Sequence, residues 1–420
     1  NAHIFKPPYI NMGVEDRIVL ENLHIHDSRG TRVINIGASS SEFTSGDFKP
    51  GSVPIVMRSI VLENNNLSEG PALSVENVRA DIEALNITGT FVSKASEFLS
   101  GRVVGAINAR FGADLAGGKY SASVYDSYFG APSPFISFPC NRASVICEET
   151  SSVAFVRTTF VIANSFATAV ACMGASSPSL VQATFQPDWS FGISHPAIVA
   201  MDASKPYIAL TNFDFPMRSS GSKTDAMVII AGLASVLVYR CDIFLHSSQS
   251  TQNGPAFAEV LSSTASLHAN TVNFVGGVSN MIVKTMHSET PTGSEMLILT
   301  DCFISGTFFN GVFDLEGAPL SVSDTTFSNI TVLNTSPWRG KTRGALNIAF
   351  RTVTMENVVF KDVNVPAVVV DSTELHVSEV TISGTNASLP NMVADASTVV
   401  SHLTSICAVL DGPNVQCLNN

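Results

Sequence analysis

Two acidic side chains have the type and spacing that cleavage of a glycosidic bond requires. Asp301 and Asp324 lie near the same phase of two successive copies of a sequence repeat, and Asp126 lies at the corresponding phase of an earlier copy. Hydrolysis of a glycoside uses two carboxyl groups about 5 to 10 Å apart, one on each side of the bond. Asp301 and Asp324 are therefore the candidate catalytic pair if the repeats stack on one another.

The same phase also allows a structural interpretation. Across the repeats it holds residues of mixed type, namely Asn22, Asp126, Arg157, Gln182, Asn212, Arg240, Asp324, Asn357 and Glu379. Such a mixture favours a polar column that satisfies backbone groups at turns. We expect Asp126 and Arg157 to pair across neighbouring copies, and we prefer this interpretation to catalysis by Asp301 and Asp324.

A second candidate site is the segment from Trp338 to Arg343, which combines one of only two Trp residues with three cations on an acidic chain. An exposed Trp beside cations can stack on a sugar ring or hold an acidic polysaccharide. Trp338, Arg339, Lys341 and Arg343 are therefore carbohydrate-contact candidates. The alternative is a loop whose Trp packs on the body of the protein. Trp189 is a weaker second candidate.

A metal site is conceivable at His24 and His26. One residue separates them, so on a strand both side chains point to the same side, a geometry that can hold a transition metal. No third ligand is evident nearby, and the alternative is an exposed polar face. The sequence has no calcium-binding nonapeptide repeats, no P-loop and no nucleophile elbow. We expect no cofactor.

The elements that must position these residues come from a recurring unit. An apolar residue, four mostly polar residues and then Phe or Ile recur along the chain. The plainest copies are Val124 to Phe129, Phe155 to Phe160, Leu180 to Phe185 and Leu210 to Phe215, and further copies end at Ile243, Phe303, Phe327, Phe360 and Ile382. Between Ile25 and Ile382 the spacing averages about 30 residues, a period that indicates a solenoid.

A second apolar segment lies between successive copies and often begins with Gly or Pro before Ala, as after Gly70, Gly254 and Gly344. Val, Ile, Thr and Phe dominate both segments, and helical stripes are scarce. The pattern predicts an all-β, single-stranded parallel β-helix, or β-solenoid, of about 13 coils with loops of variable length.

The composition agrees with this architecture. Only 14% of the 420 residues are charged, against roughly 25% in an average globular protein. There are 26 Phe but two Trp and six Tyr, and we expect the Phe residues to stack as an internal ladder. A hydrophobic content of 45% excludes disorder, and a net charge of -12 disfavours nucleic-acid binding.

No membrane insertion is expected either. The longest apolar stretch, Ala226 to Tyr239, is shorter than the roughly 20 residues that span a bilayer. It is interpreted as two buried strands joined by a turn at Gly232.

Seven Cys residues bear on the compartment. Two pairs lie close in sequence, Cys140 with Cys147 and Cys407 with Cys417, and both are disulfide candidates. Free buried thiols are the alternative for each pair. The other three, Cys172, Cys241 and Cys302, lie in apolar runs and are expected to stay unpaired.

Five N-x-Ser/Thr sequons are N-glycosylation candidates, at Asn66, Asn86, Asn329, Asn334 and Asn386. The chain begins at Asn1 without Met or a signal sequence and is interpreted as a mature or trimmed product. The sequons and the Cys pairs together predict a secreted protein that is extracellular or on the cell surface.

The periodicity and the paired motifs resemble the pectin lyase-like superfamily of right-handed parallel β-helices over nearly the whole chain. The segments at Gly105 and Gly344 also resemble repeats of polymorphic outer-membrane protein passengers, without their doubled Gly and without Asn three residues after Phe. The resemblance implies right-handed coils. The clusters with which family members cleave pectic sugars are missing, both the Asn-Thr-Asp, Asp-Asp, His-Gly and Arg-Ile-Lys set and the Trp-Ile-Asp-His and Arg-x-Pro-x-x-Arg set.

We therefore expect a non-enzymatic, extracellular structural or adhesive module of a larger surface or filament assembly, whose partners are other subunits or further copies of the chain. Two alternatives remain: a pectin lyase-like carbohydrate-active enzyme, either a polysaccharide lyase or a glycoside hydrolase, and a carbohydrate-binding module without catalysis. We expect residues 17–405 to form the β-helix, residues 1–16 an N-terminal cap or arm, and residues 406–420 a C-terminal cap.

Overall fold

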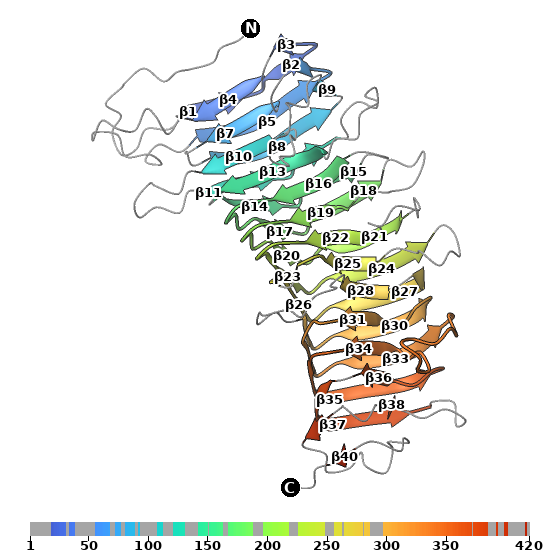
Figure 1. Ribbon diagram of the computed structural model, residues 1–420. Coiled ribbons are helices and arrows are strands. Elements are labelled where there is room, and N and C mark those ends of the chain that lie inside the picture. Colours follow the sequence, from blue (N-terminus) through green and yellow to red (C-terminus); the bar gives the residue numbers. More distant parts are fainter. Residues whose placement is uncertain are drawn as a thin grey trace, which may run out of the picture. The chain divides into compact units, whose positions relative to one another are not determined.

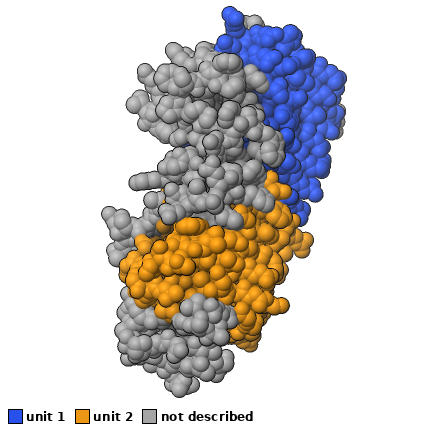
Figure 2. Space-filling model, turned by 90° about the vertical axis from the view of Figure 1, so that its right-hand side faces the viewer, with its two compact units in different colours: residues 1–212 blue, residues 213–420 orange. Residues whose placement is uncertain are grey.

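The computed structural model describes residues 18–30, 33–37, 55–67, 72–76, 80–88, 91–92, 107–111, 121–130, 142–149, 151–162, 167–187, 196–217, 226–247, 256–262, 264–279, 281–285, 297–371, 373–384, 392–393, 399–401 and 416–417. It divides into two compact units, residues 1–212 and 213–420 (Figure 2). The regular structure of the described residues is all β-strand, and no helix that could cross a membrane is found among them. Both expected caps fall outside the described residues, apart from β40 (Gln416–Cys417).

One coil follows the same order throughout each unit. In most coils two strands of a bent sheet, here called sheet A, are joined by a two-residue turn, and in four described coils one continuous strand spans that turn. One strand of a second sheet, here called sheet B, follows. A short turn starts the next coil. Figure 1 shows the strands of each unit as successive rungs.

In the first unit, sheet B contains β4 (Ile34–Gly37), β7 (Leu73–Glu76), β10 (Ile107–Phe111), β13 (Arg142–Glu149), β16 (Ala167–Cys172) and β19 (Ile198–Ala200). Sheet A contains β1 (Ile18–Glu21), β2 (His24–His26), β5 (Ile55–Glu63), β8 (Ala80–Thr88), β11 (Ser121–Tyr125), β12 (Tyr128–Phe129), β14 (Ser152–Val156), β15 (Thr159–Ile162), β17 (Ser179–Val181), β18 (Thr184–Pro187) and β20 (Tyr207–Ala209). A small third sheet holds β3 (Arg29–Gly30), β6 (Asn66–Leu67) and β9 (Phe91–Val92), and β21 (Asn212–Met217) begins at the last residue of the unit.

In the second unit, sheet B contains β22 (Ala226–Ile230), β25 (Ala256–Val260), β28 (Met281–Thr285), β31 (Phe313–Glu316), β34 (Leu346–Ala349), β36 (Val368–Asp371) and β38 (Met392–Val393). Sheet A contains β23 (Ser235–Tyr239), β24 (Asp242–Ser247), β26 (Ser266–Asn270), β27 (Asn273–Ser279), β29 (Leu297–Thr300), β30 (Phe303–Phe308), β32 (Leu320–Ser323), β33 (Thr326–Val332), β35 (Thr352–Val363), β37 (Glu374–Ser383), β39 (Val399–Ser401) and β40. The stretch from Ala226 to Tyr239 is two strands with Gly232 in the turn between them, as predicted.

The strands pair in parallel and each pairs with the equivalent strand of the next coil. Ile55 of β5, for example, pairs with Ala80 of β8, and Thr352 of β35 pairs with Glu374 of β37. Parallel neighbours joined by crossovers form right-handed coils. The fold is therefore a right-handed parallel β-helix, and its thirteen sheet B strands confirm the predicted number of coils.

Phenylalanine rings fill the inside of the coils, as the sequence predicts. The rings of Phe129 and Phe160 stack at 5.3 Å between centroids, and those of Phe327 and Phe360 stack at 4.7 Å. These rings are fully buried. Stacked aromatic pairs contribute about 0.5 to 1.5 kcal/mol beyond burial, so the Phe excess stabilises the contact between coils.

Two predicted ladder positions are wrong by one or two residues. Ile304, not Phe303, is the buried residue of its coil, and Phe303 is 45% exposed. Phe213 is fully buried in place of Phe215, whose side chain lies outside the described ones. In each coil a neighbouring apolar residue, Ile304 next to Phe303 and Phe213 near Phe215, takes the inward position, which the two-residue turn sets.

A left-handed residue recurs at each described sheet A turn. These residues have φ between 46° and 56° and are Asn22, Ser59, Ala84, Asp126, Arg157, Gln182, Leu210, Arg240, Thr271, Asp301, Asp324, Asn357 and Glu379. Their backbone amides donate to a carbonyl of the next coil, as from Asp126 to Val156 at 3.1 Å and from Asp324 to Glu356 at 3.0 Å. The polar column expected from the sequence is thus a column of turns, in which Leu210 rather than Asn212 takes the position.

The residue after each left-handed position is inside the coil, and often carries a hydroxyl. Ser127 Oγ donates to the carbonyl of Tyr125 at 2.7 Å, and Thr325 Oγ1 donates to that of Ser323 at 2.8 Å. Cys302 occupies the same position, where its thiol donates to the carbonyl of Thr300 at 3.4 Å. Ser, Thr and Cys at this position therefore all satisfy the same buried carbonyl, that of the residue two positions earlier.

The buried cysteines form no disulfide with one another. Cys147, Cys172, Cys241 and Cys302 are all buried and outside any disulfide in the described part of the chain, which confirms the expectation for the last three. The expected Cys140–Cys147 disulfide is not formed, because Cys147 points into the coil and pairs in register with Cys172 of the next coil. Cys407 and the side chain of Cys417 lie outside the described residues.

Substitution of Cys302 by Thr should remove one source of alkaline instability. Burial raises the pKa of the Cys302 thiol to about 11 from 9.0, so its contribution to stability is complete below pH 9 and is lost as the pH rises through about 11. We expect Cys302→Thr to match the wild type at pH 7 and to lose about 2 kcal/mol less between pH 9 and pH 11 in equilibrium urea unfolding. Parallel pH profiles for the two proteins would contradict this.

Two coils of the second unit approach each other closely at glycines. A Cβ on Gly306, whose φ is +115°, would lie 2.0 Å from the carbonyl oxygen of Gly276, and a Cβ on Gly276 would lie 2.7 Å from the ring of Phe308. We expect Gly306→Ala to lower the unfolding free energy by about 3 kcal/mol or more.

Gly340→Ala is the matched control for Gly306→Ala. Its φ is +77° and no atom lies within 4 Å of an added Cβ, so strain alone should cost about 1 kcal/mol. Equal losses in thermal and urea unfolding of the two variants would show that the close approach does not matter.

Candidate functional site

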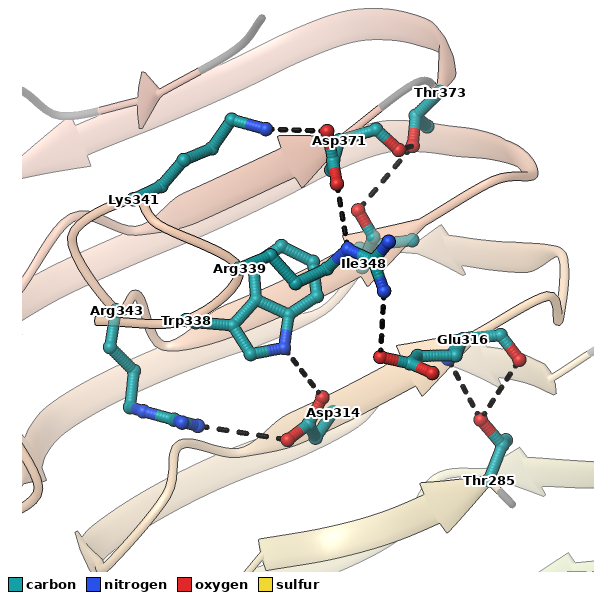
Figure 3. A network of polar contacts seen from close by, with 10 residues as sticks. All are labelled: Thr285, Asp314, Glu316, Trp338, Arg339, Lys341, Arg343, Ile348, Asp371 and Thr373. Carbon is teal, nitrogen blue, oxygen red and sulfur yellow. Dashed lines mark hydrogen bonds and ion pairs between the residues drawn. The ribbon is translucent and has the colours of Figure 1, made fainter. Parts of the chain in front are cut away.

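The largest polar network of the described residues lies on the outer face of sheet B in the second unit (Figure 3). In β31, Phe313 and Leu315 are fully buried, whereas Asp314 and Glu316 alternate with them and point outward. Asp371 ends β36, two coils further along. Strand alternation thus brings three carboxylates to one face.

The loop after β33 covers this face. Trp338 is 4% exposed and packs against Ala349 and Val369, which point outward from β34 and β36. Its Nε1 donates to Asp314 Oδ1 at 2.9 Å. The backbones of Trp338 and Lys341 donate to each other at 2.8 Å, which closes a two-residue turn and fixes the ring over the sheet.

Two cations of the loop bind two of the carboxylates. Arg339 Nε donates to Asp371 Oδ2 at 2.7 Å and its terminal nitrogen donates to Glu316 Oε1 at 3.0 Å. Lys341 Nζ donates to Asp371 Oδ1. The guanidinium of Arg339 also lies 4.3 Å from the centre of the Phe350 ring, a cation–π contact. The hydrogen bond to Asp371 raises the pKa of Arg339, which keeps it charged.

The third carboxylate has a third cation. Arg343 lies 3.6 Å from Asp314 Oδ2 and donates to the carbonyl of Asn310 at 2.9 Å. Burial raises the pKa of Asp314, and the nearby Arg343 and the hydrogen bond from Trp338 partly oppose the rise. A carboxyl group with a raised pKa is the kind that can serve as a general acid.

Of the two interpretations of this loop, the one in which its Trp packs on the body of the protein is confirmed. Because Trp338 is buried by its own loop, its ring is not available to stack on a sugar. Arg339, Lys341 and Arg343 do lie together, as their spacing suggested, but each is bound to a carboxylate of the same chain. Three positive and three negative charges meet, so the network is electrically neutral and ties the loop to β31 and β36. Trp189 lies outside the described residues.

The other candidate acids belong to the turn column. Asp301 Oδ2 accepts from Thr271 Oγ1 at 3.2 Å, and Asp324 Oδ1 accepts from Asn357 Nδ2 at 2.7 Å. Each aspartate is thus bonded to the left-handed residue of a neighbouring coil. The predicted pairing of the turn column is confirmed at its other end, where Arg157 binds Asp126 through two hydrogen bonds of 2.7 and 2.8 Å.

His24 and His26 do point to the same side of β2, with ring centres 5.1 Å apart. Their acidic partners differ: His24 contacts Glu63 at 3.1 Å and His26 contacts Asp27 at 2.9 Å. No group of three His, Cys, Asp or Glu that could hold a metal ion is found in the described part of the chain.

The sequons differ in how open they are. Asn66 and Asn329 are exposed, and Asn329 has a left-handed backbone. Asn86 Oδ1 is buried in β8, and Asn334 Nδ2 donates to Asn310 Oδ1 at 2.6 Å. Asn386 lies outside the described residues. Asn66 and Asn329 are therefore the sites at which a sugar would meet least obstruction.

Sequence reasoning missed the three carboxylates of the network. Asp314 and Glu316 alternate with Phe313 and Leu315, which is a sequence signal for outward side chains on a strand. Asp371 follows three Val residues in the same way. That these acids meet the cations of the loop follows from the register of β31, β34 and β36, which no sequence motif encodes.

Comparison with known proteins finds no family model and no curated protein that matches the chain. Among solved structures, polygalacturonase from Erwinia carotovora ssp. carotovora is similar at 9% sequence identity and a TM-score of 0.28, over 89% of this chain and 97% of that one. The chain is a parallel β-helix. Its own strand pairing establishes this fold, which is the fold that the resemblance noted in the sequence implied.

Replacement of Asp371 by Asn should loosen the loop. Asp371 is 14% exposed and faces both Arg339 and Lys341. Removal of its charge leaves Glu316 as the carboxylate that contacts Arg339 and takes away the carboxylate that binds Lys341. We expect a loss of about 2 kcal/mol in urea unfolding, between the values for exposed and buried pairs. The control Asp301→Asn, on the exposed column, should lose less than about 0.5 kcal/mol. A loss as small in Asp371→Asn would show that the network does not hold the loop.

Proposed function

We propose that the protein is a non-catalytic extracellular β-solenoid with a structural or adhesive role in a surface assembly. The observation that carries this proposal is the complete ion pairing of the network. Asp314, Glu316 and Asp371 each contact a cation of their own chain. A carboxylate held in this way is not free to donate a proton to a sugar or to accept one from water.

The distribution of the other polar side chains supports the same role. Polar side chains bond to equivalent positions in the next coil, both beside the turn column, as Arg58 does with Glu21 at 3.2 Å, and within it, as Asn357 does with Asp324 at 2.7 Å. Such contacts set the register of stacked coils rather than the orientation of a substrate. The hydrogen bonds and ion pairs of these side chains therefore stabilise the stacking of the coils.

A second candidate function is cleavage of a polysaccharide. One observation favours it: Asp314 has a raised pKa and shares one outer face of sheet B with Glu316 and Asp371. Carboxyl groups whose pKa values are pushed apart are the usual acid and base of a glycosidase. In this candidate the loop from Trp338 to Arg343 would have to leave the face before a sugar could reach Asp314.

Assays on polysaccharides separate the two functions. The wild type is incubated with polygalacturonate, methylated pectin, alginate and a neutral glucan, and both new reducing ends and unsaturated uronates are measured. We expect no product above that of heat-denatured protein. Activity that falls at least about 100-fold in Asp314→Asn would assign catalysis to the network, and activity lost in Asp301→Asn or Asp324→Asn would assign it to the turn column. Either result contradicts the proposal.

The extracellular part of the proposal rests on the open sequons Asn66 and Asn329. The same protein is therefore produced through a secretory pathway, and its mass is measured before and after enzymatic deglycosylation. A secreted protein without any sugar would remove this support. We further propose that its partners are other subunits or copies of the chain, and a monomer at every concentration in light scattering would contradict self-association.

A further inference from the structure

Two exposed tyrosines flank the left-handed turn of one coil in the first unit. Tyr125 ends β11 and is 37% exposed, and Tyr128 begins β12 and is 36% exposed. Between them, Asp126 adopts the left-handed conformation and Ser127 points inward. The turn therefore directs both rings to the solvent on either side of Asp126.

A planar ion pair lies at the same turn. Arg157, the left-handed residue of the next coil, donates through Nε to Asp126 Oδ1 at 2.7 Å and through a terminal nitrogen to Oδ2 at 2.8 Å. About half of each side chain is exposed, 55% for Arg157 and 47% for Asp126. Two backbone amides that bond between coils hold the pair in place. The pair thus presents fixed donors and acceptors to the solvent.

The neighbouring coils add further polar groups. Tyr128 pairs in register with Asn86 on one side and Thr159 on the other. Tyr125 pairs with Glu83 and Val156. Residues in register on neighbouring strands lie about 4.8 Å apart, so both rings lie close to side chains that can form hydrogen bonds.

We propose that the tyrosine patch, defined as Tyr125, Asp126, Tyr128 and Arg157, binds a neutral saccharide. A pyranose ring has an apolar C–H face that can lie on a tyrosine and hydroxyl groups that can bond to a carboxylate and a guanidinium at once. An apolar side chain of a protein partner would instead displace water from the ion pair. It could not replace the hydrogen bonds that the water had made, which is unfavourable.

The local charge specifies a neutral rather than an acidic ligand. The charge of Asp126 is balanced by Arg157, and Glu83 shares Arg58, which lies 3.5 Å away, with Glu21. No cation of the patch is left to attract a uronate, and the chain as a whole has a net charge of -12. This inference rests on the adhesive role proposed above, to which it adds a ligand.

The second unit offers a matched control surface. Phe303 begins β30 directly after its turn, the position that Tyr128 has in β12, and is 45% exposed. The left-handed residue beside it, Asp301, bonds to Thr271 and not to a guanidinium. Phe303 thus has an exposed ring without the planar ion pair, so its removal should not affect saccharide binding.

Affinity electrophoresis in gels that contain xyloglucan, galactomannan or mixed-linkage glucan tests the proposal, with polygalacturonate as the acidic comparison. We expect at least one neutral polysaccharide to retard the wild type equally at low and high salt. The double variant Tyr125→Ala/Tyr128→Ala should bind at least 10-fold more weakly, as loss of two stacking rings predicts. Tyr125→Phe/Tyr128→Phe should stay within about 3-fold, and Phe303→Ala should be unchanged.

Three outcomes would overturn the proposal: no retardation of the wild type by any neutral polysaccharide, equal binding by the double Ala variant, or retardation by polygalacturonate alone. Thermal unfolding of each variant shows that it is folded before binding is compared. Failure here is distinguishable from failure of the proposed function, because that function is contradicted by polysaccharide turnover and not by absence of binding.

Discussion

The hydrogen bond that left-handed residues such as Asn22, Asp126 and Asp324 donate to the next coil is the contact on which the rest of the structure depends. A residue with positive φ costs about 1 kcal/mol or more when it is not Gly, yet the chain repeats it in every coil with residues as unsuited as Leu210. The amide at this position is turned toward the next coil, where it finds a carbonyl. Because a buried amide without a partner would cost more than the strain, the turn is stable only when another coil lies beside it.

Because each turn needs a neighbouring coil, polar side chains are placed where they bond to the next coil. In the turn column, Asp126 with Arg157 and Asp324 with Asn357 join equivalent positions of neighbouring coils. On sheet B the same happens on a larger scale, where the loop around Trp338 uses Arg339 to join Glu316 of one coil to Asp371 of another. Several charged residues in the described part of the chain are thus placed between coils.

The repeat could be read from the sequence because its physical cause is local. Each repeat unit can be recognised within six residues by its alternating apolar residues, its polar turn and its inward Phe. The fold, the number of coils and the Asp126–Arg157 pair were all predicted from these units. The errors occurred where two large apolar residues lie close together, as Phe303 and Ile304 do, since only the turn geometry decides which is inside.

The candidate site was harder to predict for a different reason. Trp338 and its cations were recognised, but their burial and their partners depend on residues 23 to 32 positions away that only the strand register brings near. The same limit applies to Cys147, whose neighbour in space is Cys172 of the next coil and not the nearby Cys140. The sequence indicates such pairs only where both residues fall at the same phase of the repeat, as Asp126 and Arg157 do.

The direction of the hydrogen bonds also determines how a stack of coils responds to force. Bonds between coils run along the stack, so tension applied in that direction loads all the bonds of one interface in parallel and the successive interfaces in series. The force a unit withstands is then that of its weakest interface and does not increase with the number of coils. Where Gly276 and Gly306 bring two backbones into close approach, the bulky side chains that would separate neighbouring coils are absent.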